Sequence, residues 1–127
     1  MALPNPIPTV QGSRLVLGPG LWQDTFLIVP GTSDYVTAGY VISSLALRFN
    51  PTYGIQSAWI SGANATAQTW GVIPTLALAQ IGATATGAGF EGYSQILFYA
   101  YVLSTGAQVA NGGNLAGAVW QLTVQGQ

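Results

Sequence analysis

Apolar and polar side chains alternate most regularly near the end of the chain. In the segment Ala118–Gln125, the residues Trp120, Leu122 and Val124 alternate with glutamine and threonine. A period of two is typical of a strand with one buried and one solvated face. The segment Tyr93–Leu103 is instead apolar at most positions. That pattern predicts a central strand covered on both sides, or a strand at an interface.

The same kind of segment recurs along the chain. Short runs rich in Val, Ile, Leu, Tyr, Trp and Thr are separated by clusters of Gly, Pro, Asn and Ser, which favour hairpin turns. No segment keeps the apolar period of a long helix, and one helical turn is expected at Ser43–Leu47, with Ser43 as its candidate cap. The predicted strands are Ser13–Leu17, Thr25–Val29, Ile55–Ser61, Thr69–Leu78, Tyr93–Leu103 and Ala118–Gln125.

The beginning of the chain differs from the rest. Pro4, Pro6 and Pro8 alternate with other residues, which disfavours helix and predicts an extended arm over residues 1–12. Residues 13–127 are long enough to bury the core of a single β domain. The expected fold is therefore all-β, an antiparallel β-sandwich or a small barrel, with a Pro-rich N-terminal arm.

Charge is nearly absent from this sequence. Charged residues make up 4% of the chain, against about 25% in ordinary soluble domains. The solubility of the chain must therefore come from uncharged polar groups. The net charge of −1 gives copies of the chain almost no mutual repulsion. We therefore expect a protein that works in an assembled state, in contact with copies of itself.

The composition also removes most catalytic chemistry. There is no His, Cys or Lys, so the usual general bases and transition-metal ligands are missing, and we expect neither an enzyme nor a cofactor. A glycosidase pair or a calcium site would have to come from Asp24, Asp34 and Glu91, which suit turns and ion pairs better. Arg14 and Arg48 are expected to form ion pairs within the chain or at an interface.

Several classes of partner are excluded in the same way. Two arginines far apart in the sequence do not form the basic patch that nucleic-acid binding requires. The longest apolar run, Ile96–Leu103, is far shorter than the roughly 20 residues of a membrane-spanning helix. The first residues carry no basic region or hydrophobic block of a secretory signal, so we expect synthesis in a host cytoplasm.

Aromatic residues are the remaining candidates for recognition. Trp59, Trp70 and Trp120 fall in predicted strands, where packing is the common role. Trp22 follows the turn Gly18–Gly20 and is the best candidate for an exposed ring, either against a sugar or in a protein interface.

Two stretches resemble small virion proteins of tailed bacteriophages. One runs from Asp34-Tyr35 through Thr37-Ala38-Gly39-Tyr40 to Leu45-Ala46-Leu47, and the other is the tail that spans residues 107–117 with its following strand. Ala38 stands where a glycine is expected. The resemblance implies a capsid decoration (cement) protein, a homotrimer on the outer capsid surface of the virion that bridges copies of the major capsid protein.

The leading hypothesis is thus a structural protein that binds and stabilises an assembled phage head. A carbohydrate-binding, lectin-like fibre module and a self-polymerising tail or connector subunit stay open as alternatives. The residues expected to contact the partner belong to the arm, to the turn after the first strand and to the aromatic strand: Leu3, Pro4, Pro6, Ile7, Pro8, Trp22, Phe98, Tyr99 and Tyr101.

Overall fold

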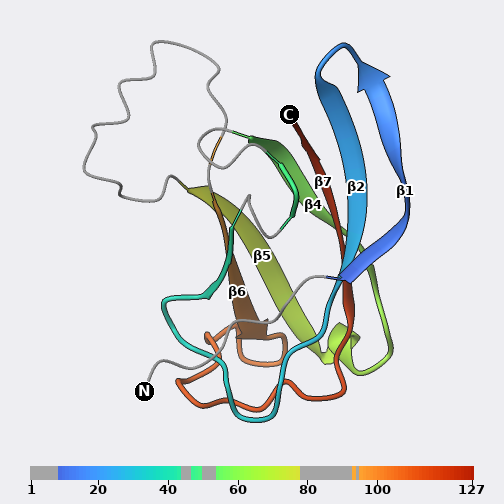
Figure 1. Ribbon diagram of the computed structural model, residues 1–127. Helices are drawn as coiled ribbons and strands as arrows, with labels where there is room; N and C mark the ends of the chain where they lie inside the picture. Colours follow the sequence, from blue (N-terminus) through green and yellow to red (C-terminus); the bar gives the residue numbers. More distant parts are fainter. Residues whose placement is uncertain (1–8, 44–46, 50–53, 78–92, 94) are drawn as a thin grey trace.

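The computed structural model describes residues 9–43, 47–49, 54–77, 93 and 95–127 (Figure 1). Within these residues the chain forms strands connected by turns, with a single turn of 3-10 helix, η1 (Ala67–Thr69). No helix in this part of the chain is long and apolar enough to span a membrane. The strands are β1 (Thr9–Gly18), β2 (Leu21–Ile28), β3 (Tyr40–Ser43), β4 (Ile55–Ala63), β5 (Trp70–Ala77), β6 (Gln95–Val102) and β7 (Trp120–Gly126).

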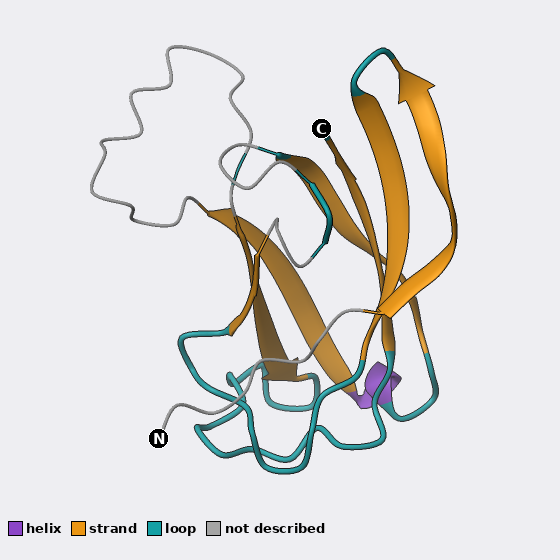
Figure 2. Ribbon diagram, viewed as in Figure 1, coloured by secondary structure: helices purple, strands orange, loops and turns teal. Residues whose placement is uncertain are grey.

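The strands pair into two antiparallel sheets that face each other (Figure 2). One sheet has the order β1-β2-β7-β4 and the other has the order β3-β6-β5. The predicted all-β fold is confirmed, and of the two architectures left open the described strands form the sandwich. Each sheet buries one face against the other because inward-pointing residues alternate with outward-pointing ones.

The core lies between the two sheets. Phe26 and Ile28 come from β2, and Leu122 and Val124 from β7, as the alternation in the sequence predicts. Phe98 of β6 meets Trp120 of β7 edge-on, with the ring centroids 5.3 Å apart. Each such side chain contributes about 2–3 kcal/mol by leaving water, so this aromatic contact helps to hold the two sheets together.

The structure corrects the predicted boundary between the arm and the first strand. β1 begins at Thr9, so residues 9–12, predicted as part of the arm, belong to this strand, and Thr9 to Gln11 pair with β2. Within β1 every residue has a backbone N–H, and Gly12, with φ 72°, lies in the irregularity between Gln11 and Leu15. Residues 1–8 of the predicted arm lie outside the described residues.

Strand β3 is missing from the sequence prediction. Its four residues are too few to show a period, and Ser43, predicted as a helix cap, is its last residue. The Leu47 N–H donates to the Ser43 carbonyl at 3.2 Å, which is one bond of helical type. The rest of that predicted turn lies outside the described residues.

The opposite orientations of neighbouring residues on β6 give the first prediction. Replacing the fully buried Phe98 by alanine should lower the free energy of unfolding by about 3–5 kcal/mol in urea titrations, because it leaves a cavity between the sheets. Tyr99→Ala on the outer side is the matched control and should cost clearly less. Equal losses would contradict the register of β6 described above.

Candidate functional site

The outer surface of the three-stranded sheet is the first candidate for recognition. Outward-pointing side chains of β6 lie beside those of β3 and β5, with Leu97 opposite Val41 and Tyr99 opposite Ile73. Leu103, just after β6, places its Cδ2 2.9 Å from where a Cβ of Gly71 would stand, so this glycine makes room for it. We call the following set the aromatic face: Val41, Ile73, Leu97, Tyr99, Tyr101 and Leu103.

The aromatic face is apolar and uncharged, and part of it is exposed to solvent. Ile73 is 53% exposed and Leu103 is 61% exposed. Leu97, Tyr99 and Tyr101 are half-buried. Large apolar side chains gathered on one side of a sheet mark interaction sites more often than scattered single ones do. Tyrosine-rich, charge-poor surface is also the composition of interface cores.

The opposite side of the sandwich has a different character. On the outer surface of β2, β7 and β4, Thr123 Oγ1 lies 2.7 Å from Ser61 Oγ and 3.3 Å from Thr25 Oγ1. Gln125 Nε2 donates to Gln23 Oε1 at 2.9 Å, and its Oε1 accepts from Ser57 at 3.1 Å. We call this hydrogen-bonded surface the polar face. The two outer surfaces therefore differ: one is built mainly of hydrogen-bonded polar groups, with Trp59 40% exposed among them, and the other presents mainly apolar and aromatic groups.

The residues predicted from the strand Tyr93–Leu103 divide between the inside and the outside. Tyr99 and Tyr101 belong to the aromatic face. Phe98 points inward and is fully buried, so its predicted contact with a partner is wrong. The apolar run hid this difference, because nothing in the sequence distinguishes the two sides of β6. Ile73 and Leu103 were not predicted, although Ile73 lies in the predicted strand Thr69–Leu78.

A second feature of the structure is a cluster of charged side chains that contains both arginines. Asp24 points inward from β2 and is buried, and its Oδ2 accepts from Arg14 Nε at 3.0 Å and from Arg14 Nη2 at 2.8 Å. Arg48 Nη2 lies 3.6 Å from the same oxygen, while Arg14 also donates to the Arg48 carbonyl at 2.9 Å. We call Arg14, Asp24 and Arg48 the charged cluster. The expectation that the arginines form ion pairs within the chain is confirmed.

Trp22 lies against the charged cluster. The Arg14 guanidinium carbon is 4.9 Å from the centroid of the Trp22 ring and 4.9 Å from that of Phe49, in cation–π geometry. Trp22 is half-buried and packs against the core. Trp22 is therefore half-buried and not the fully exposed ring that the sequence predicts. The turn Gly18–Gly20 gave no indication that Arg14 covers part of this ring.

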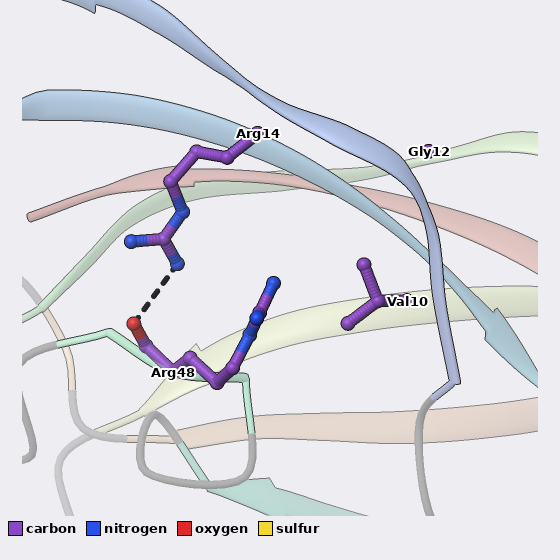
Figure 3. A pocket seen from close by; sticks show the side chains of 4 residues that line it. All are labelled: Val10, Gly12, Arg14 and Arg48. Carbon is purple, nitrogen blue, oxygen red and sulfur yellow. Dashed lines mark hydrogen bonds between the residues drawn. The ribbon is translucent and has the colours of Figure 1, made fainter.

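Two clefts border the cluster, and Arg48 lines both. The first, of about 490 Å³, lies between Arg14, Arg48, Val10 and Gly12, and Figure 3 shows the Arg48 side chain between Arg14 and Val10. The second, of about 460 Å³, is lined by Gly20, Trp22, Arg48 and Gln127. With two cations and one carboxylate, the cluster carries a formal charge of +1, and Arg48 is its more exposed member.

The second aspartate serves a separate network. Asp34 accepts hydrogen bonds from the Tyr40 hydroxyl and from the Gly31 N–H, the latter at 3.0 Å. Burial raises the pKa of Tyr40, and its hydrogen bond to Asp34 raises it further, so this phenol stays protonated. The Tyr35 hydroxyl accepts from the Ala100 N–H at 3.0 Å. These hydrogen bonds thus fix the β2–β3 connection to β6.

Asp24 and Asp34, the two carboxylates that the structure describes, do not form a shared catalytic or calcium site. Asp24 and Asp34 have different partners, and the described part of the chain holds no group of three or more side chains suited to a metal. Glu91 lies outside the described residues. Comparisons of the chain with protein-family models, with curated proteins and with solved structures gave no significant match. The resemblance to phage decoration proteins stays a prediction.

The charged cluster gives the second prediction. Asp24→Asn should lower the free energy of unfolding by about 3 kcal/mol, because it removes the buried negative charge that pairs with the Arg14 guanidinium. Arg48→Ala should cost less than about 1 kcal/mol, because that arginine is largely exposed and its contact is longer. Urea unfolding of both variants at neutral pH measures the difference. A larger loss for Arg48→Ala would reverse the assignment of Arg14 as the main partner.

Proposed function

We propose that this chain is a structural virion protein of the capsid decoration type, which docks by its aromatic face on the outer surface of a phage head. The observation that carries the proposal is the aromatic face itself, an uncharged apolar surface on one side of the sandwich. The polar face on the other side suits contact with water in the bound state.

The physics of such docking follows from the composition of the aromatic face. Burying Ile73, Leu103 and the exposed parts of the tyrosines removes apolar area from water, while no charged group of that face has to be desolvated. A protein that binds the assembled shell better than free capsid subunits stabilises the shell by mass action. No catalytic group is needed for this role, in keeping with a chain that has no His, Cys or Lys.

The sequence adds the arm to the proposed contact. Leu3, Pro4, Pro6, Ile7 and Pro8 precede β1, and an extended proline-rich segment costs little entropy to order on a partner. We assign the arm the role of a clip that lies along the major capsid protein, beside the contact made by the aromatic face. The two contacts together would act as linked binding modules on one lattice.

The third prediction concerns the aromatic face. Particles of capsid density from the organism that encodes the chain should contain it, and heads depleted of it should rebind the recombinant protein in co-sedimentation. Ile73→Lys should weaken rebinding at least about tenfold, because it buries a charge in an apolar contact. Gln56→Lys, on an exposed position of β4, is the matched control and should rebind normally.

Two results would contradict the docking proposal. One is equal rebinding by Ile73→Lys and the wild-type chain. The other is absence of the chain from every particle of capsid density. Circular dichroism and urea unfolding of both lysine variants establish that each remains folded, so that lost rebinding reports the surface.

The fourth prediction concerns the arm. Deleting residues 2–8 should leave the free energy of unfolding within about 0.5 kcal/mol of the intact chain, because β1 begins only at Thr9. The same deletion should weaken rebinding to depleted heads. Unchanged rebinding would remove the arm from the contact and leave the aromatic face as the proposed docking surface.

A further inference from the structure

The outer edge of the four-stranded sheet carries a second apolar surface. β1 is the last strand on its side of that sheet, and β2 is the strand that pairs with it among the described residues (Figure 1). Near its end, Leu15 is 52% exposed, Val16 is 65% exposed and Leu17 is 42% exposed. Neighbouring residues of a strand point to opposite faces, so apolar side chains are exposed to solvent on both faces of β1 here. We call Leu15–Leu17 the edge segment.

The edge segment carries no charge or proline of the kind that keeps many strand edges from pairing. Natural edges are blocked by lysine, by proline, by an inward-pointing charge or by a β-bulge. β1 contains no lysine and no proline, and its one charged residue, Arg14, is held by Asp24 on the inside. Irregularities lie between Gln11 and Leu15 and between Val16 and Gly18, and between them Leu15 and Val16 pair regularly with β2.

We propose that the edge segment pairs antiparallel with the edge segment of a second copy of this chain, about a two-fold axis at Val16. In this register Val16 stands opposite Val16 of the second copy, and Leu15 stands opposite Leu17. Both partners of every pair are then apolar, so the segment is complementary to itself, which a two-fold interface requires. The free backbone groups of the two edges complete each other's ladder.

The self-complementary register favours a second copy, and no charge opposes its approach. With a net charge of −1 for the whole chain and no charge in the edge segment, two copies meet without repulsion. The interface lies on the edge of one sheet, whereas the aromatic face covers the outside of the other sheet. A dimer formed in this way keeps both aromatic faces available, and the inference does not depend on the capsid proposal.

The pairing has a consequence for stoichiometry. A two-fold contact uses the same segment of both copies and closes at two, whereas a trimer requires two different surfaces on each copy. The edge segment alone therefore predicts a dimer, where the resemblance to decoration proteins implies a trimer.

Two experiments test the inference: a measurement of the oligomeric state, and disulfide formation by a single introduced cysteine. Light scattering during size-exclusion chromatography should give a dimer for the wild-type chain. Val16→Lys should raise the dissociation constant at least about a hundredfold, because it places like charges opposite each other at the axis. Ile73→Lys, a lysine on the aromatic face, should remain a dimer.

The chain has no cysteine of its own, so a single introduced cysteine reports one contact. With oxidised glutathione, Val16→Cys should form a disulfide-linked dimer much faster than Ile73→Cys, since opposite residues of an antiparallel pair lie within reach of such a bond. A monomer at every concentration, a trimer, a dimer that persists in Val16→Lys, or equal rates for the two cysteine variants would each overturn the pairing.

Discussion

The scarcity of charge is the constraint on which the rest of this structure depends. With five charged side chains in 127 residues, the exterior of the sandwich must be wetted by uncharged groups or covered by another surface. One outer surface follows the first possibility and the other follows the second. The polar face, around Thr123 and Gln125, satisfies its hydroxyl and amide groups through hydrogen bonds to one another. The aromatic face leaves Ile73 and Leu103 bare, which is the condition of a surface that meets a partner.

The charges that the chain does have serve mainly to hold it together. Arg14 on β1 reaches Asp24 on β2, and through its bond to the Arg48 carbonyl it also ties the segment after β3 to the same place. Asp34 is used in the same internal way by Tyr40. The edge segment and the aromatic face contain no charged residue, so recognition at both depends on apolar contact and backbone pairing.

The sequence predicted the all-β class and the strand β7, whose alternation reports directly which side chains are buried. It did not separate Phe98 from Tyr99, because the orientation of β6 depends on its pairing with β3 and β5 and its residues are apolar on both sides. Strand β3 was missed because four residues are too few for a period to emerge. The sequence predicted an exposed Trp22 because the residue that lies over its ring, Arg14, comes from a neighbouring strand, and strand pairing cannot be read from the sequence. The aromatic face as a whole required the register of three strands.

Side-chain footprinting tests the central claim most directly. Hydroxyl radicals label exposed aromatic rings, and labelling of Tyr99 and Tyr101 is compared between the free protein and the protein bound to phage heads. Trp59, which is exposed on the polar face, serves as the internal reference. Our account predicts that Tyr99 and Tyr101 become protected on the particle while Trp59 is labelled as before. Protection of Trp59 with unchanged labelling of the two tyrosines would contradict it.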